Sequence, residues 1–348
     1  MIEIEDVSKS WDDFKISNIS LEIEKGEYFV VLGPTGAGKT LLLEILAGFH
    51  TPDRGDIYIK GEKFTHLKPN ERGFAFVYQD YMLFPHMNVR ENIAYGLKIA
   101  EKDGIDEKVE NIAKKVEVAH LLERDPYTLS GGEKQRVSMA RAMVMEPEVL
   151  LLDEPFGSVD YQTARKLRDM MNELHKKFKC TVVQVTHNQE EAMILGDRIA
   201  VVRDGSIEQV GIPEDIMRKP ESRFVADFVG TENIFHAVLQ NDEDGTSVKI
   251  KGSSITFHTT KKARGEITIT IRPEDIILAE KALESSARNN FKGKIEKITD
   301  RGNFHEVLLD IGAPLIVYVT KQSVEELSLE RGKKVNALFK ASAVHVIE

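Results

Sequence analysis

This sequence of 348 residues has a single cysteine, no long apolar run and no excess of positive charge. Because Cys180 is the only cysteine, no disulfide can form within the chain, which fits a reducing compartment. No apolar run approaches the roughly 18 residues of a membrane span, and LLLEILAGF, among the longest, contains Glu44. The start, MIEIEDVSKSW, is too acidic and too polar for a signal peptide. We therefore expect a cytoplasmic protein that meets a membrane only through a partner.

The charge balance is acidic, with 47 Lys+Arg against 57 Asp+Glu and a net charge of −10. This balance argues against a general attraction to nucleic acid or anionic lipid, and it leaves room for local anion sites. With 41% hydrophobic and 30% charged residues, the composition is that of an ordinary soluble globular protein. The length predicts about two domains.

The first part of the chain has the pattern of a parallel sheet covered by helices. Short apolar runs at residues 28–32, 149–152 and 180–185 predict buried strands, and a helix-like stretch follows each of them. Between the first two runs, residues from about 85 to 148 are mostly helical in pattern. This block predicts a helical subdomain inserted into an α/β core.

The pattern changes near Gly230, after which short β segments alternate with turn sequences such as TDRGN. The stretch 233–238 resembles 290–295, and each is followed further along by a similar strand end, IRPEDI or FKASAV. Two copies of a small β unit are the simplest account of this similarity. We expect two domains, residues 1–230 and 231–348, the second with two related halves.

A glycine-rich loop follows the first predicted strand and precedes a helical run, which is the order of a phosphate-binding P-loop. Its glycines let backbone N–H groups turn around phosphate oxygens at the positive end of the helix. Lys39 would reach the β- and γ-phosphates, and Thr40 would bind Mg²⁺. A glycine-rich turn without a ligand is the alternative. The predicted ATP-binding residues of the loop are Gly33, Pro34, Thr35, Gly36, Ala37, Gly38, Lys39 and Thr40.

Two acids, Asp153 and Glu154, end the apolar run at 149–152. Acids at the end of a buried strand cost desolvation energy unless they are used. Beside a phosphate-binding loop, we expect Asp153 to hold Mg²⁺ through its water shell. Glu154 would polarise the attacking water as a general base. The alternative is a pair of solvated acids.

The segment LSGGE, residues 129–133, opens another predicted helix. Ser130 and Glu133 form an S-x-x-E capping box, which explains these two residues locally. It does not explain Gly131 and Gly132, which cost helix stability and leave N–H groups bare at a positive helix end. The paired glycines therefore indicate a second phosphate contact.

In this order and spacing, the glycine loop, LSGGE, LLLDE and Thr186-His187 resemble an ATP-binding-cassette (ABC) ATPase of the class that powers importers. The resemblance covers about residues 1–230 and implies an α/β P-loop NTPase fold with ATPase activity coupled to transmembrane transport. It implies that Trp11 stacks on adenine. The implied catalytic residues are Glu154, His187, Lys39 and Gln79. Further implied ATP contacts are Ser130, Gly131, Gly132 and Asp160, and the implied Mg²⁺ ligands are Thr40, Gln79 and Asp153.

Three positions depart from the family's usual pattern. Glu133 replaces the usual glutamine, the loop 157–160 reads GSVD, and Asn188 follows His187 where aspartate is frequent. None of them removes a catalytic group, but Asn188 leaves the partner of His187 open.

The resemblance also implies partners. The family works as a head-to-tail homodimer, so that Ser130 and Gly132 of one subunit would close over the ATP of the other. It implies a pair of transmembrane permease subunits, an indirect link to an extracytoplasmic substrate-binding protein, and a peripheral position on the cytoplasmic face of the membrane. The segment 82–86 is either a groove for the permease or ordinary packing.

The C-terminal part resembles the regulatory domains of importer ATPases, with an all-β oligonucleotide/oligosaccharide-binding-like fold of the TOBE or molybdate-binding Mop type. A tetrahedral dianion needs hydroxyls, N–H groups and one or two cations converging on a small pocket. The alternative is a dimerisation module with solvated charges, and Asn289-Asn290 departs from the usual step after the arginine. The residues that match the motif are Ser286, Ala287, Arg288, Thr320, Lys340, Ala341 and Ser342.

These resemblances predict an importer ATPase for molybdate or tungstate whose C-terminal domain senses intracellular oxyanion and inhibits transport. Its cofactors would be ATP and Mg²⁺, with molybdate or tungstate as regulatory ligand. One alternative keeps the ATPase but makes the cargo sulfate, sugar or polyamine, with a C-terminal domain that only dimerises. A second is a soluble ABC ATPase acting on nucleic acid, which the single cassette without a long heptad run disfavours. A stand-alone oxyanion store would leave the ATPase motifs without a purpose.

Overall fold

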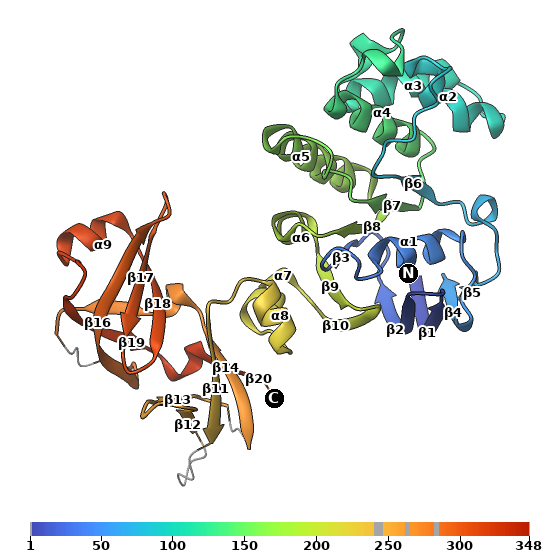
Figure 1. Cartoon of the computed structure of the whole chain (residues 1–348). Helices are drawn as coiled ribbons and strands as arrows, with labels where there is room; N and C mark the ends of the chain where they lie inside the picture. The colour runs from blue at the N-terminus through green and yellow to red at the C-terminus, as the bar shows by residue number, and fades with distance from the viewer. Residues whose placement is uncertain (1, 240–245, 262–264, 282–284, 348) are drawn as a thin grey trace. The chain divides into compact units, whose positions relative to one another are not determined.

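The computed structural model describes residues 2–239, 246–261, 265–281 and 285–347 (Figure 1). The chain forms two compact units, residues 1–213 and 214–348. This division falls earlier in the sequence than the expected boundary near Gly230. The reason is that the segment after residue 214 packs within the second unit, where His345 Nε2 donates to the Pro220 carbonyl at 3.0 Å.

A six-stranded sheet in the order β10-β9-β3-β8-β7-β6 forms the centre of the first unit. Neighbouring strands pair in parallel except β9 and β10. Every residue of β3, β7 and β8 is buried, as expected for parallel strands covered on both faces. The strands are β3 (Tyr28–Leu32), β6 (Ala75–Val77), β7 (Val149–Asp153), β8 (Thr181–Thr186), β9 (Arg198–Arg203) and β10 (Ser206–Gly211).

A second, antiparallel sheet has the order β2-β1-β4-β5. One buried core joins side chains of the two sheets and of helix α1 (Lys39–Ala47), among them Ile4, Phe29 and Leu43. The glycine-rich loop connects the carboxyl end of β3 to the start of α1. The strands are β1 (Ile2–Ser10), β2 (Lys15–Ile23), β4 (Arg54–Ile59) and β5 (Glu62–Lys63).

The helical subdomain expected from the sequence is present between β6 and β7. Helices α2 (Val89–Ile99), α3 (Ile105–Lys115) and α4 (Gly131–Met143) pack against one another and form a separate lobe (Figure 1). Two further helices, α5 (Tyr161–Phe178) and α6 (Gln189–Leu195), follow β7 and β8.

The second unit contains two five-stranded antiparallel sheets, ordered β13-β12-β11-β14-β20 and β15-β19-β16-β17-β18. A single apolar core lies in this unit, with Phe257, Leu309 and Phe339 among its buried members. The strands are β11 (Asn233–Leu239), β12 (Ser247–Ile250), β13 (Thr256–His258), β14 (Glu266–Ile271), β15 (Ile277–Ala279), β16 (Asn289–Asp300), β17 (His305–Asp310), β18 (Pro314–Val319), β19 (Lys334–Phe339) and β20 (Val344–Ile347). The helices are α7 (Pro213–Arg218), α8 (Arg223–Phe228) and α9 (Lys321–Glu326).

The two sheets of this unit exchange their last strands. β15 follows β14 in the sequence but pairs with β19, whereas β20 follows β19 but pairs with β14. A short 3-10 turn precedes each exchanged strand, at Pro273–Asp275 and Ala341–Ala343. The result is an all-β, OB-like unit in which each half contributes to both sheets.

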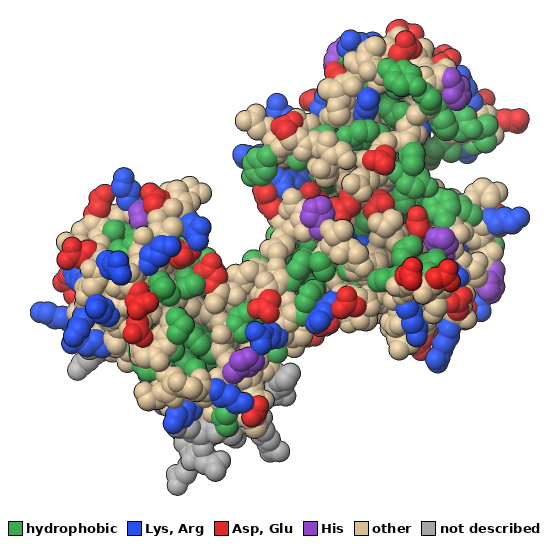
Figure 2. All heavy atoms as spheres, in the orientation of Figure 1, with side chains coloured by type: hydrophobic (Ala, Val, Ile, Leu, Met, Phe, Trp, Pro, Cys, Tyr) green, Lys and Arg blue, Asp and Glu red, His purple; other side chains and the backbone are tan. Residues whose placement is uncertain are grey.

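Charge is distributed without a continuous region of one sign on the face drawn in Figure 2, where acidic and basic side chains are interspersed. Within the described ranges, no helix combines the length and the apolar character that a membrane crossing requires.

Candidate functional site

The glycine-rich loop holds its lysine in place through the loop's own carbonyl groups. Lys39 is 6% exposed, and its Nζ donates to the carbonyl oxygens of Gly33 and Pro34, each at 2.9 Å. Burial lowers the pKa of Lys39, although Glu154 and Asp153 oppose that effect. Gly36 and Gly38 have φ angles of 82° and 93°, a region that side chains disfavour. The loop therefore has the backbone freedom and the cation of a phosphate cradle.

Thr40 and Asp153 bring two oxygen atoms together at the start of α1 and the end of β7. Thr40 Oγ1 donates to Asp153 Oδ1 at 3.0 Å. Burial raises the pKa of Asp153, and the Thr40 hydrogen bond lowers it. Hydroxyl and carboxylate oxygens are the donors that Mg²⁺ prefers, and the ion usually keeps several of its waters. The pair therefore has the donor chemistry of a Mg²⁺ site, in which Asp153 would act through the water shell.

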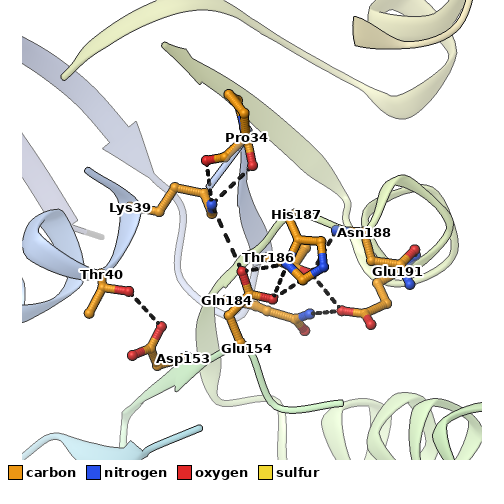
Figure 3. Close-up of polar contacts among 11 residues, drawn as sticks. Pro34, Lys39, Thr40, Asp153, Glu154, Gln184, Thr186, His187, Asn188 and Glu191 are labelled. Atoms are coloured by element: carbon orange, nitrogen blue, oxygen red, sulfur yellow. Dashed lines mark hydrogen bonds and ion pairs between the residues drawn. The ribbon is translucent and has the colours of Figure 1, made fainter. Parts of the chain in front are cut away.

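Glu154 lies between Lys39 and His187 (Figure 3). Its carboxylate is 2.9 Å from His187 Nδ1 and 3.8 Å from Lys39 Nζ. The side chain of Glu154 is 13% exposed, whereas that of His187 is 57% exposed. Glu154 also has a φ of 45°, in the sparsely populated left-handed region, and its N–H donates to Val185 O at 3.0 Å. His187, whose partner the sequence left open, thus pairs with the predicted general base.

A network of hydrogen bonds among buried side chains adjoins Glu154 (Figure 3). Thr186 Oγ1 lies 2.8 Å from Glu191 Oε2 and 3.4 Å from Glu154 Oε2. Gln184 Nε2 donates to Glu191 at 3.0 Å, and the Tyr28 hydroxyl donates to Gln184 Oε1 at 2.6 Å. Glu191 is 3% exposed, and burial is the main cause that raises its pKa to about 7. Sequence reasoning missed Glu191, because its only signal is a second acid in NQEEAM.

A pocket of about 370 Å³ adjoins the glycine-rich loop. Gln79, exposed after β6, lines it together with Glu154 and Phe14. Trp11 is not among the lining residues; its ring meets His50 edge-on at 5.4 Å and lies 5.6 Å from Lys9 Nζ. Phe14 is therefore the aromatic residue that reaches the loop, and sequence reasoning missed it.

The segment after Gln79 is held by α4. Tyr81 and Met82 have positive φ angles, and Arg141 donates to both of their carbonyls, at 3.1 and 2.6 Å. The Ser158 hydroxyl donates to the Gln79 carbonyl at 3.5 Å. These bonds connect the loop containing Gln79 with the segment before α5.

Ser130 caps α4, as the sequence predicts. The carboxylate of Glu133 accepts from Ser130 N at 2.7 Å and from Ser130 Oγ at 2.8 Å, and these bonds lower the pKa of Glu133. Gly132 also has a packing role, because a Cβ there would lie 2.6 Å from Thr163 Cγ2 of α5. A Cβ at Gly131 would meet the Tyr81 hydroxyl at 3.2 Å.

Asp160 and Asn188 are N-caps of the next two helices. Asp160 Oδ1 accepts from the backbone N–H groups of Gln162 and Thr163, both at 3.1 Å, and its hydrogen bonds with Thr163 are the main cause that lowers its pKa. Asn188 caps α6 by accepting from Glu191 N at 3.3 Å. None of Ser130, Gly131, Gly132 and Asp160 lines the pocket beside the glycine loop of the same chain.

The predicted oxyanion residues separate into two groups. Ser286, Ala287 and Arg288 precede β16, and Lys340, Ala341 and Ser342 follow β19; Asn289 pairs with Phe339, so these segments lie at one end of the sheet. Thr320 follows β18, whose Val319 pairs with His305, which in turn pairs with Asp300 at the other end of β16. Thr320 also caps α9, accepting from Ser323 N at 3.1 Å. The seven residues therefore do not converge within one chain.

Comparisons with known proteins identify the relatives of the chain. A family model for ABC transporters matches residues 16–157, and one for the TOBE domain matches residues 285–346. The chain is 43% identical to the molybdate/tungstate import ATP-binding protein WtpC of Pyrococcus horikoshii, covering 99% of both chains. It is 38% identical to the spermidine/putrescine import ATP-binding protein PotA of Clostridioides difficile, over 95% of this chain and 94% of that protein. Among solved structures, the dimeric post-hydrolysis state of the ATP-binding cassette MJ0796 bound to ADP and Pi matches with a TM-score of 0.55. The identity is 29%, covering 61% of this chain and 99% of that one.

Proposed function

The chain belongs to the ABC-transporter ATP-binding proteins of the import class, and from this premise we propose that it drives the import of molybdate or tungstate. As a member of that family it binds ATP and couples ATP hydrolysis to transport. The cargo proposal is supported by the 43% identity to import proteins of Pyrococcus along nearly the whole chain. The single structural observation that carries the activity is the convergence of Lys39, the Thr40–Asp153 pair and the Glu154–His187 pair on one sheet edge.

We infer that these residues divide the work of hydrolysis. Lys39 would neutralise the β- and γ-phosphates, because its ammonium is already fixed at the loop. Glu154 would orient and deprotonate the attacking water, and His187 would orient the Glu154 carboxylate and contact the γ-phosphate. Gln79, which lines the pocket, would lie beside the γ-phosphate. Adenine would stack on Trp11 or, by its place at the loop, on Phe14.

Thr40, Asp153 and Gln79 would hold Mg²⁺. When bound, the ion supplies charge neutralisation for the phosphate oxygens. The donor chemistry of the adjacent Thr40 and Asp153 oxygens, 3.0 Å apart, is the observation in favour of this assignment.

The pocket beside the loop is open to solvent without Ser130, Gly131, Gly132 or Asp160. We propose that a second copy supplies these residues in a head-to-tail homodimer, where the N-terminus of α4 would face the γ-phosphate. ATP would then bridge the two copies, and hydrolysis would release them. The dimer would act on a pair of permease subunits at the cytoplasmic face of the membrane. A binding protein on the other side would deliver the cargo to these subunits.

Glu154→Gln tests the mechanism. The amide keeps the shape of the side chain but cannot accept the proton of water. We expect ATP binding to persist and turnover to fall by about two orders of magnitude or more, because general-base catalysis contributes roughly 10²–10⁴-fold. Unchanged hydrolysis would remove Glu154 from this role.

The cargo is tested with the assembled transporter and its binding protein in liposomes. We expect molybdate or tungstate to stimulate ATP hydrolysis and sulfate to do so less. The relative from Clostridioides difficile, whose name assigns it spermidine and putrescine, makes polyamine the second candidate cargo. Stimulation by spermidine alone would overturn the oxyanion proposal and leave the ATPase intact.

We further propose that residues 231–348 sense the intracellular oxyanion and inhibit transport. Ser286, Arg288, Lys340 and Ser342 lie on segments at one sheet end, and Thr320 would have to come from a second copy. Inhibition requires that the oxyanion bind the resting state more tightly than the ATP-closed state. Titration of the assembled transporter with molybdate, tungstate and sulfate on the ATP side should lower its ATPase activity; a flat response to all three would refute the sensor.

A further inference from the structure

A cavity of about 250 Å³ lies in the second unit, and Arg288 is not among its lining residues. Its wall combines the end of α7 and the residues after it, strand β14, the IRPEDI turn and the turn before β20. The lining residues are Met217, Arg218, Lys219, Thr231, Thr270, Arg272, Asp275, Ser342, Ala343 and His345. Neither the ATPase mechanism nor the proposed oxyanion residues account for it, apart from the shared Ser342.

Two of the residues that line the cavity each have a buried side-chain atom without a hydrogen-bond partner. Among the described residues, neither Thr231 Oγ1 nor Arg272 Nη2 has one. Thr231 is 8% exposed, and the side chain of Arg272 is 16% exposed. Buried donors without partners destabilise a fold, so such groups in a cavity wall indicate a ligand that accepts hydrogen bonds.

The residues that line the cavity carry more positive than negative charge. Three cations, Arg218, Lys219 and Arg272, line it, against one acid, Asp275. Arg218 Nη1 is 3.9 Å from Asp275, and Arg272 Nη1 is 3.7 Å from Glu274, both longer than a hydrogen bond. Outside the lining, Arg218 also lies 3.7 Å from Glu214, and Lys219 pairs with Asp215 at 2.7 Å.

His345 also lines the cavity. Burial is the main cause that lowers the pKa of His345, which favours the uncharged ring, and its Nε2 donates to the Pro220 carbonyl at 3.0 Å. The hydroxyls of Thr231, Thr270 and Ser342 supply neutral donors beside the guanidinium groups. The wall therefore has the donor set of a small oxyanion site.

The volume limits the size of the ligand. Since a water molecule occupies about 30 Å³ in the liquid, 250 Å³ holds a tetrahedral oxyanion with a few waters but is small for a nucleotide. We propose that this cavity binds one tetrahedral oxyanion per chain, held by Arg272, Thr231 and Arg218. The bound anion would tie the segment 217–219 to β14 and to the turn before β20. The proposal concerns binding by the chain itself and does not depend on the transported cargo.

Calorimetry on the full chain without nucleotide tests the site with molybdate, tungstate, sulfate and phosphate as probes. We expect at least one of them to bind with a stoichiometry of one per chain. Thr231→Val keeps the shape but removes the unpartnered hydroxyl, and Arg218→Gln removes an exposed cation whose loss the fold tolerates. Each should weaken binding at least about tenfold, which corresponds to about 1.4 kcal/mol, because each removes a hydrogen-bond donor to a charged ligand.

Arg331→Gln is the matched control, because it removes an exposed cation of the same unit that belongs to neither candidate anion site. Unchanged affinity in Arg331→Gln, together with weakened binding in the two cavity variants, supports the cavity. Binding that is lost in Arg288→Gln but kept in Arg218→Gln and Thr231→Val would overturn it, as would the absence of heat with all four anions. If Thr231→Val fails to fold, Arg218→Gln alone decides between these results. Transport assays are unaffected by this outcome, so a failure here leaves the cargo proposal standing.

Discussion

Replacement of Glu191 by glutamine should make the first unit more stable at alkaline pH. Burial raises the pKa of Glu191 to about 7 from its ordinary value of 4.5, with the charge of Glu154 acting in the same direction. Thr186, Arg168 and His187 act in the opposite direction. The folded state therefore favours the neutral carboxyl. Its stabilising effect is complete below pH 4.5 and is lost as the pH rises through about 7.

The size of the effect follows from these two values. Over the whole range the difference in pKa corresponds to about 3 kcal/mol of unfolding free energy, of which about 2.5 kcal/mol falls between pH 5 and pH 8.5. Glutamine keeps an oxygen that can accept from Gln184 and Thr186 but carries no charge. The variant should therefore gain about 2.5 kcal/mol over the wild type between the two pH values.

Urea unfolding followed by tryptophan fluorescence measures this difference. Trp11 is the only tryptophan and belongs to the same unit as Glu191, so the signal reports on that unit. Glu173→Gln, at an exposed position of α5, is the control and should track the wild type at both pH values. If the Glu191→Gln difference is the same at pH 5 and pH 8.5, burial does not penalise the ionised carboxyl and the reasoning is wrong.

Three further substitutions test the packing at Gly132, the proposed Mg²⁺ ligand Thr40 and the buried amide of Asn92. Gly132→Ala should lower the free energy of unfolding in urea by about 1–3 kcal/mol, because the new Cβ would lie 2.6 Å from Thr163 Cγ2. Adding Thr163→Ser removes that methyl group and should restore part of the lost stability. No gain in the double variant would count against this contact. Thr40→Val should make ATP affinity, measured by fluorescent nucleotide titration, insensitive to replacing Mg²⁺ by EDTA, and a retained Mg²⁺ dependence would exclude Thr40 as a ligand. Asn92→Leu should lower the free energy of unfolding by about 2–4 kcal/mol in the same assay. The fully buried amide of Asn92 makes four hydrogen bonds to the segment before α2. A loss below about 1 kcal/mol would show that these hydrogen bonds contribute little to stability.

The central strands and the phosphate loop were predictable because their signals are local. An apolar run that ends in Gly33 or in Asp153 identifies both the strand and the sheet edge where its next residue lies. The pairing of His187 with Glu154 was not predictable, since it depends on the register of β7 against β8. Glu191 was missed because an acid in the first turn of a helix is ordinary in a sequence. Only the buried contacts of α6 make this acid unusual.

The second unit was less predictable because its pairings are not between neighbours in the sequence. The similarity of IRPEDI and FKASAV indicates two copies, but it cannot say that each copy gives its last strand to the other sheet. Motif matching likewise grouped Thr320 with Arg288, whereas the strand register puts them at opposite ends of β16. A list of motif residues does not contain the strand directions that separate them.

Helix caps explain why motif residues alone could not separate structural from catalytic roles. Ser130, Asp160, Asn188 and Thr320 are each the N-cap of a helix, and each satisfies backbone N–H groups with its own side chain. A helix start can also present its remaining N–H groups to an anion. At Ser130, the capping role and the proposed phosphate contact therefore fall on the same residue. Replacement of Ser130 would alter the cap in either case, so only a nucleotide-binding measurement on a variant of matched stability can assign the phosphate contact.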